Sequence, residues 1–336
     1  MRNFIFISFF ILVTIIIVNN YSKNPHLVNI SGKTMGNISY NIKYLDVNNI
    51  NYKRNIDSIL VSFNNSLSTY IPESEISNFN KSDTLNNIST TLFNILDISK
   101  NIYDKTFGAF DPTIGILVNL WGFGPEKIID IPDTLLIINS LKNVGFEQVY
   151  FDQKVAIRHN ANTYLDFSAI AKGYAVDVLA EFLLKQNIQD FMIEIGGEVK
   201  CNGNQNKTNW LIGIETPYDN NNTNNPIAVV NLINKSLATS GNYRNFYINN
   251  NIKISHTIDP RTGFPSNSNL LSASVFHTNC VQADAYATAF MVLGLDQSIE
   301  IIENNKELDA LLIYTDDSDS IKTYVSKNII EYVDLL

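Results

Sequence analysis

The chain has 336 residues, of which 45% are hydrophobic and 17% charged, a composition typical of a globular protein with a sizeable core. Its 24 Lys and Arg residues against 33 Asp and Glu residues give a net charge of −9, which argues against a general affinity for nucleic acid or anionic membranes. Only Cys201 and Cys280 are cysteines, so a disulfide framework is excluded, and the sequence leaves open whether these two pair.

The chain opens with an apolar run of the kind found in export signals. Arg2 precedes the run FIFISFFILVTIII, and the polar stretch NNYSKN follows it. A short positive region before a short apolar core predicts a signal peptide or a signal anchor over residues 1–20. No clear small-residue cleavage site is present, so both forms stay open. No cysteine follows the run, which argues against lipid attachment.

Periodic apolar residues predict two helices in the first third of the chain. The first covers residues 56–67 and ends before Pro72, and the second covers residues 85–102 with one apolar face. The loop GAFDPT (108–113) follows them. Residues 148–158 alternate as in a hairpin that turns at Asp152 and Gln153.

Strands dominate the second half. After a helix expected to run to about Gln186, the segment FMIEIGG (191–197) predicts a short buried strand ending in two glycines. Further strands are expected near 210–215, 227–233, 244–248, 252–258 and 308–315, with a helix over 281–295. Because strands outnumber helices and often adjoin one another, the prediction is an α+β fold with mixed or antiparallel sheets and packed helices. We expect one large domain over residues 27–334.

The segment ADAYATA (283–289) contains a candidate metal site. Asp284 and Thr288 are four residues apart, so both side chains project from one face of the expected helix. A carboxylate and a hydroxyl are hard oxygen ligands that suit Mg²⁺. The alternative is that Asp284 caps the helix and Thr288 hydrogen-bonds to a backbone carbonyl, which for this motif alone is the commoner arrangement.

The segment LDFSAIAKG (165–173) contains a candidate anion site. If Ser168 caps the following helix, free backbone N–H groups and the helix dipole would favour an anion there. Lys172 in the first helical turn opposes the dipole unless an anion such as a phosphate offsets its charge. Alternatively, the Lys172 side chain extends into solvent.

The segment SHTIDPRTG (255–263) places His256 before a turn that contains Asp259 and Arg261. A single histidine is more often structural than catalytic. The charged turn beside it makes His256 a candidate for acid–base chemistry.

Taken together, these segments resemble one family, the ApbE-type flavin transferases (FAD:protein FMN transferases). The matching blocks follow one another in the family's order and cover nearly everything after the export segment. They are GAFDPTIGILVNLWGFG (108–124), LDFSAIAKGYAVD (165–177), IEIGGEV (193–199), ATSGNYRNFY (238–247), SHTIDPRTGFP (255–265) and VQADAYATAFMVLG (281–294). One departure is Ile116, which stands where a proline is common in the family.

The resemblance implies a reaction and a set of site residues. Members of the family move the FMN half of FAD onto a Ser or Thr of an exported or membrane protein, form a phosphoester, release AMP and use Mg²⁺. Carried over by position, the implied metal site comprises Asp284 and Thr288 with backbone oxygens of Ala169 and Ala287. His256 is the implied base or transition-state stabiliser. The implied FAD site comprises Met35, Tyr70, Ala109, Phe110, Asp111, Asp166, Lys172 and Ile258.

The resemblance also implies a location and a partner. The acceptor would be a respiratory flavoprotein subunit, and the enzyme would sit on the outer, periplasmic face of the bacterial cytoplasmic membrane, held by an anchor. Two other functions are open at this stage. One is a FAD pyrophosphatase that yields FMN and AMP, and the other is a flavin-binding protein without turnover.

Overall fold

A computed structural model of the chain describes residues 24–125, 131–205, 207–217, 226–242, 246–249 and 252–336. The predicted export segment, residues 1–20, lies outside these ranges. Within them, none of the helices combines the length and apolarity needed to span a bilayer.

The centre of the fold is an eight-stranded sheet in which every neighbouring pair is antiparallel. Its strands, in spatial order, are β1 (His26–Thr34), β2 (Ile38–Asp46), β6 (Phe191–Ile195), β7 (Glu198–Asn202), β10 (Ser236–Gly241), β13 (Leu270–His277), β14 (Asp309–Thr315) and β15 (Ile321–Val325). The predicted α+β class with antiparallel pairing is confirmed. The predicted strands at 191–197 and 308–315 both belong to this sheet.

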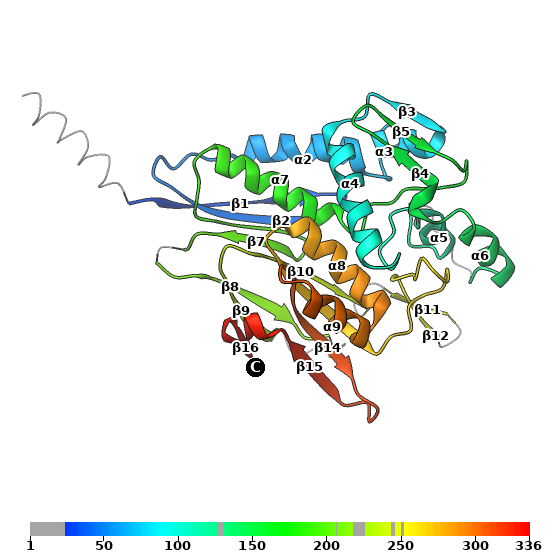
Figure 1. Cartoon of the computed structure of the whole chain (residues 1–336). Helices are drawn as coiled ribbons and strands as arrows, with labels where there is room; N and C mark the ends of the chain where they lie inside the picture. The colour runs from blue at the N-terminus through cyan, green and yellow to red at the C-terminus, as the bar shows by residue number, and fades with distance from the viewer. Residues whose placement is uncertain (1–23, 126–130, 206, 218–225, 243–245, 250–251) are drawn as a thin grey trace, which may run out of the picture.

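Helices cover one face of this sheet (Figure 1). They are α2 (Lys53–Leu67), α4 (Thr90–Lys105), α7 (Ala171–Lys185), α8 (Cys280–Leu293) and α9 (Leu295–Asn304). The predicted apolar stripe of α2 is buried at Ile56, Leu60 and Phe63 and joins the main core. Helix α8 is buried on nearly all sides because it packs on β10 and β13 below and on α7 beside it. The expected helix over 281–295 stops at Leu293 because Gly294, with φ +78°, ends it.

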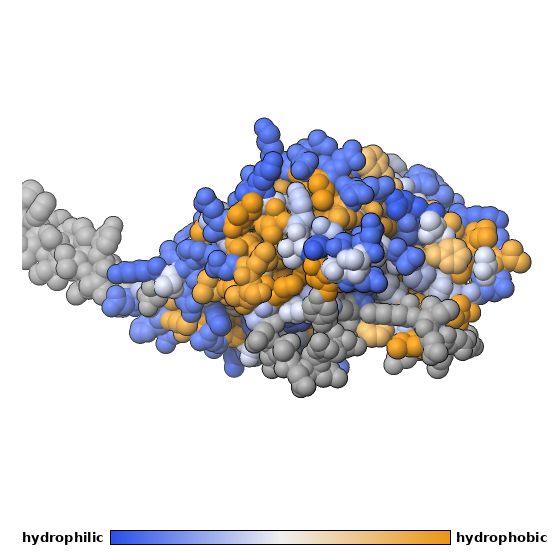
Figure 2. All heavy atoms as spheres, turned by 90° about the horizontal axis from the view of Figure 1, so that it is seen from below, coloured by the Kyte–Doolittle hydropathy of each residue, from blue (hydrophilic) through white to orange (hydrophobic). Residues whose placement is uncertain are grey.

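A small sheet covers the opposite face. It contains β8 (Trp210–Glu215), β9 (Pro226–Leu232) and β16 (Val333–Leu335), the last preceded by the short 3₁₀ helix η2 (Lys327–Tyr332). Trp210, Val230 and Ile214 pack against the underside of the central sheet in a second, smaller core. The face seen in Figure 2 mixes apolar and hydrophilic side chains.

The remaining elements lie at one end of the molecule (Figure 1). They are α3 (Glu75–Lys81), β3 (Thr84–Asn86), α5 (Gly115–Leu120), α6 (Thr134–Leu141), η1 (Phe146–Gln148), β4 (Val149–Phe151), β5 (Val155–Arg158), β11 (Phe246–Asn249) and β12 (Ile252–Ser255). The predicted hairpin is confirmed, with Phe151 opposite Ala156.

The predicted helix over 85–102 was placed too early. Leu85 belongs to β3 and pairs with Ala156 of β5, and α4 begins only at Thr90. Ser89 sets that start, because its side chain accepts a hydrogen bond from the backbone N–H of Leu92 at 3.0 Å. Spacing alone could not separate a buried strand residue from the first turn of the helix.

Candidate active site

A cavity of about 660 Å³ lies between the C-terminal end of α2, the start of α7, α8, β10 and the segment 256–258. We call it the central cavity. The residues that line the cavity are of two chemical kinds, charged and apolar. Charged side chains on α7, β7 and α8 form one part of the lining, and apolar and aromatic side chains together with His256 form another.

The charged end is a cluster of three side chains, Lys172, Glu198 and Asp284. The ammonium Nζ of Lys172 lies 3.0 Å from Glu198 Oε1 and 3.5 Å from Asp284 Oδ1. Glu198 is 3% exposed and Asp284 is 1% exposed, so both carboxylates depend on protein partners. Glu198 Oε2 is buried and has no hydrogen-bond partner among the described residues. The cluster is therefore incompletely satisfied, and it carries a net negative charge when both carboxyl groups are ionised, so it can take a cationic or hydrogen-bonding ligand.

Close packing of α7 on α8 creates this cluster. A Cβ at Gly173 would lie 2.4 Å from the carbonyl oxygen of Cys280 and 2.8 Å from Asp284 Cβ, so only glycine allows this approach. The backbone N–H of Gly173 donates a hydrogen bond to Asp284 Oδ2 at 2.9 Å. This bond fixes the carboxylate, so that its other oxygen, Oδ1, faces Lys172.

Burial and mutual charge shift the ionisation of the cluster. Burial raises the pKa of Asp284, and it raises the pKa of Glu198 to about 8, while the Lys172 ammonium opposes both shifts. Burial lowers the pKa of Lys172, but the charges of Asp284 and Glu198 outweigh it, so the net shift of this pKa is upward. Lys172 is thus a fixed positive charge inside the cavity. The alternative in which Lys172 extends into solvent is excluded.

Asp284 and Thr288 lie on one face of α8 and both line the central cavity. Asp284 sits in the body of the helix, whose N-cap is Asn279, so the capping alternative is wrong. Thr288 Oγ1 lies 3.2 Å from Ser240 Oγ on β10. Ala169 also lines the cavity. Within the described ranges no three His, Cys, Asp or Glu side chains converge on one point. A hard cation here would therefore bind to Asp284, Thr288 and backbone oxygens, and this oxygen set fits Mg²⁺.

The local structure before α7 differs from expectation. Ser168 was expected to cap the helix, but the N-cap residue is Ile170, which makes no side-chain cap. The Ser168 hydroxyl and N–H instead donate hydrogen bonds to Asp166 Oδ1. Competition by this nearby carboxylate explains the error. Burial raises the pKa of Asp166, and the two bonds from Ser168 oppose that rise.

The other end of the cavity is formed by loops and aromatic side chains. Met35, with φ +47°, lies in the turn between β1 and β2. His256 is half-buried and meets the ring of Phe123 edge-on, with ring centroids 6.2 Å apart. Tyr70 is 63% exposed, whereas Ile258 is buried. All five residues line the cavity, so a flat ring system would find apolar walls here.

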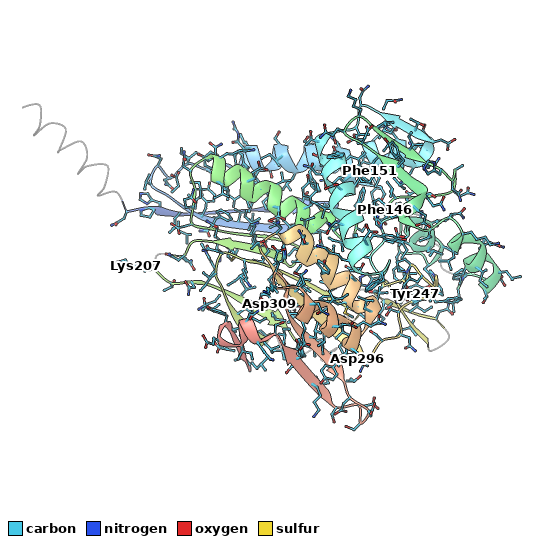
Figure 3. The ribbon with its side chains drawn as sticks, in the orientation of Figure 1. Phe146, Phe151, Lys207, Tyr247, Asp296 and Asp309 are labelled. Carbon is cyan, nitrogen blue, oxygen red and sulfur yellow. The ribbon has the colours of Figure 1, made fainter. Side chains whose placement is uncertain are left out.

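A third core holds the His256 segment in place. It joins α5, α6 and β12 through buried residues that include Leu117, Ile137 and Ile254. The indole N–H of Trp121 donates a hydrogen bond to the carbonyl oxygen of Gly263 at 2.8 Å. Tyr247 of β11 packs on Phe123 with ring centroids 5.4 Å apart, and Figure 3 shows Tyr247 at this end of the molecule. The residues on both sides of His256, Ile254 and Ile258, are therefore buried in this core.

Four predicted site residues do not line the cavity as the structure describes it. Ala109, Phe110, Asp111 and Ala287 are buried and are absent from the lining of the cavity. Asp111 accepts hydrogen bonds from the N–H and hydroxyl of Thr113 at 2.8 and 2.7 Å. Burial raises the pKa of Asp111 to about 7.

Sequence reasoning assigned no role to several residues that line the cavity. Glu198 is the most consequential, and Asn64 and Ser240 are two others. A signal for Glu198 was available, because it follows two glycines directly after a buried strand within the block IEIGGEV. Gly196 and Gly197 both have positive φ, +59° and +100°, and this tight turn brings Glu198 back toward Lys172.

The fold and this cavity define the class of the protein. The chain belongs to the ApbE family, whose family model matches residues 35–312. By this membership it is an enzyme of the transferase class.

The two cysteines, Cys201 and Cys280, are both buried and unpaired with each other.

Relatives and solved structures agree with this membership. The chain is 34% identical over 330 residues to a FAD:protein FMN transferase of Vibrio cholerae, which covers 94% of this chain and 98% of the relative. It is 36% identical over 308 residues to the protein of the same name from Haemophilus influenzae, covering 88% of each. The structure of the flavin transferase ApbE from Vibrio cholerae superposes with a TM-score of 0.82 over 92% of this chain and 99% of that one. The apo flavinyl transferase ApbE of Pseudomonas stutzeri, 28% identical, also gives 0.82, over 92% of this chain and 97% of that one.

Proposed function

We propose that this chain is a Mg²⁺-dependent FAD:protein FMN transferase. It would attach FMN through a phosphoester to a Ser or Thr of an acceptor protein and release AMP. The observation that supports this most is the placement of a partly buried, charged Lys172 beside the oxygen pair of Asp284 and Thr288, in one cavity with His256. Phosphoryl transfer depends mainly on positioning and charge neutralisation, and this arrangement offers both.

In this proposal the FAD diphosphate lies at the charged end. Lys172 would hold a diphosphate oxygen by a charge-assisted hydrogen bond. Mg²⁺, when bound, neutralises phosphate charge. Asp284 and Thr288 would be its side-chain ligands, with a backbone oxygen near Ala169, whereas Ala287 does not line the cavity. The flavin and adenine rings would occupy the apolar part of the cavity, against Met35, Tyr70 and Ile258.

His256 would take the proton of the acceptor hydroxyl. The hydroxyl oxygen then forms a bond to the phosphorus of the FMN half, and the bond from that phosphorus to the bridging oxygen breaks. The electron pair leaves with AMP. His256 is half-buried beside Phe123 and lines the cavity, so an acceptor hydroxyl that enters the cavity would come within its reach.

The export segment supports a location outside the cytoplasm. We propose that residues 1–20 direct the chain to the outer face of the bacterial cytoplasmic membrane and serve there as a signal or anchor. The acceptor would be a membrane respiratory flavoprotein subunit exposed on the same side. Cell fractionation of the full chain, compared with a variant lacking residues 2–20, tests the location.

A single experiment tests the activity. The purified enzyme is incubated with FAD, Mg²⁺ and a candidate acceptor, and the acceptor is analysed by intact mass, with AMP followed in parallel. A mass increase of one FMN together with AMP release supports the transferase. AMP and FMN without an adduct would indicate the pyrophosphatase, in which water replaces the acceptor hydroxyl. Retention of FAD with no AMP would indicate a flavin-binding protein.

A further inference from the structure

Glu198 is a buried carboxylate of the central cavity for which the proposed reaction has no use. It comes from β7, whereas the other two members of the charged cluster come from α7 and α8. Its Oε1 lies 3.0 Å from Lys172 Nζ, closer than the 3.5 Å between Lys172 Nζ and Asp284 Oδ1. Lys172 therefore has two carboxylate partners, Glu198 and Asp284, and only Asp284 is a candidate metal ligand.

A divalent cation and the Lys172 ammonium would compete for the carboxylate of Asp284. A cation bound at Asp284 Oδ1 comes close to the Lys172 ammonium and is repelled by it. Like charges at such short range repel strongly where water is partly excluded, so this repulsion is not negligible. The repulsion falls if the ammonium moves toward its other partner. Glu198 offers that partner without leaving the lysine unpaired in a buried site.

The surroundings of Lys172 permit this movement. Its side chain is 23% exposed and faces the cavity, so the ammonium is not enclosed on every side. On the β7 side, a Cβ at Gly196 would lie 3.4 Å from Lys172 Cδ and 3.8 Å from Glu198 Oε2. The lysine stem and Glu198 therefore lie within ordinary van der Waals range of the same turn. Glu198 Oε2, which has no hydrogen-bond partner among the described residues, is a second acceptor for the same ammonium.

We infer that Glu198 is a positioning residue that draws Lys172 away from Asp284, so that a divalent cation and the lysine can occupy the cavity together. This inference rests on the proposed function, because it assumes that Asp284 binds a divalent cation. Without Glu198, Lys172 would pair with Asp284 alone and compete with the cation. The lysine would then hinder the metal instead of assisting it on the diphosphate.

The test measures metal binding directly, without turnover. Mn²⁺ is titrated into the full chain in mildly alkaline buffer, and free Mn²⁺ is read from its paramagnetic resonance signal. Glu198→Gln should weaken Mn²⁺ binding about tenfold, which corresponds to about 1.4 kcal/mol. Glu198→Asp, which keeps the charge on a shorter side chain, should stay within about threefold of the wild type. Glu181→Gln is the matched control, because Glu181 pairs with Lys185 on the exposed side of α7 and its loss removes the same charge.

A double-mutant cycle separates positioning from simple charge. In a Lys172→Met background there is no ammonium to hold, so Glu198→Gln should change Mn²⁺ affinity by less than about twofold. An equal loss in both backgrounds would show that Glu198 attracts the metal by charge and does not act through the lysine. Thermal unfolding of each variant checks the fold, and Glu198→Asp keeps the test valid if Glu198→Gln does not fold.

The outcomes separate this inference from the proposed function. Wild-type affinity in Glu198→Gln, with normal Mn²⁺ binding otherwise, overturns the role of Glu198 and leaves the transferase proposal standing. A wild-type chain that binds no Mn²⁺ overturns both. The inference is supported if Glu198→Gln weakens Mn²⁺ binding in the wild-type background but leaves it nearly unchanged in the Lys172→Met background.

Discussion

The two ends of the central cavity are built from different parts of the fold. Lys172, Glu198 and Asp284 belong to regular elements of the main core, and Asp284 is 1% exposed. Met35 and Tyr70 belong to loops at the other end, and Tyr70 is 63% exposed. Electrostatic interactions are strong where water is excluded and weak where it is not. In the proposed function, the charged part of the lining holds the diphosphate and the metal, and the loop part contacts the ring systems.

The largest effect is expected from Asp284→Ala, which removes charge from the buried end. Loss of a metal ligand in a phosphoryl-transfer site costs several kcal/mol, so the FMN transfer rate should fall about a thousandfold or more. Transfer is measured at saturating FAD and Mg²⁺ with the acceptor in excess. Asp296→Ala is the control, because Asp296 is an exposed carboxylate on α9, where Figure 3 labels it. Near-wild-type turnover of Asp284→Ala would remove Asp284 from the metal site.

His256→Asn tests the proposed role of His256 as the base that takes the acceptor proton. If His256 takes the acceptor proton, the transfer rate should fall by roughly a hundredfold, and FAD affinity should change little. The wild-type rate should rise with pH as the histidine loses its proton, and the variant should lose that rise. Single-turnover rates across pH measure both effects. Weaker FAD binding with an unchanged pH profile would mean that His256 only packs against the flavin.

Lys172→Ala tests whether Lys172 contacts the diphosphate, by comparing the binding of FAD with that of riboflavin. A charge-assisted hydrogen bond to a diphosphate oxygen is worth about 1.5–3 kcal/mol, so FAD should bind roughly ten- to a hundredfold more weakly. Riboflavin has no phosphate and should bind nearly as before, because it would contact only the apolar end. Calorimetry with both ligands gives the comparison. An equal loss for both would place the diphosphate elsewhere.

Asp111→Asn concerns a buried carboxylate that does not line the cavity and, among the residues that the structure describes, forms no ion pair. Burial raises the pKa of Asp111 to about 7 from an ordinary value of 3.8. A raised folded-state pKa stabilises the fold below the unfolded value, and this contribution is lost as pH rises through about 7. The wild type should therefore lose stability relative to Asp111→Asn between about pH 4 and 8.

Urea unfolding at several pH values measures this difference, which should be on the order of 1 kcal/mol or more. A difference that does not vary with pH would show that Asp111 stays ionised in the folded chain. The effect on FMN transfer should be the smallest of the four, because Asp111 does not line the cavity.

Local sequence predicted about half of the elements of the fold and, of the eight strands of the central sheet, only β6 and β14. The apolar stripe of α2, the hairpin of β4 and β5 and the strand β6 follow from spacings of 3.6 and 2 residues, which each segment shows by itself. The i,i+4 relation of Asp284 and Thr288 on one helix face is equally local. Errors arose where a neighbour in space or a nearby carboxylate decided the outcome, as at Leu85, which pairs with β5, and at Ser168, which bonds to Asp166.

Only the tertiary structure decided which of these local features share a cavity. Lys172 and Asp284 are 112 residues apart, and their contact exists because Gly173 allows α7 to pack closely on α8. Glu198 reaches the same point from a third element, through the turn at Gly196 and Gly197. Conversely, Ala109, Phe110 and Asp111 are buried and absent from the lining of the cavity, although their sequence block matches the family. Periodicity fixes which face a side chain takes within its own element, whereas the packing of one element on another fixes which faces meet, and in this protein that packing forms the charged site.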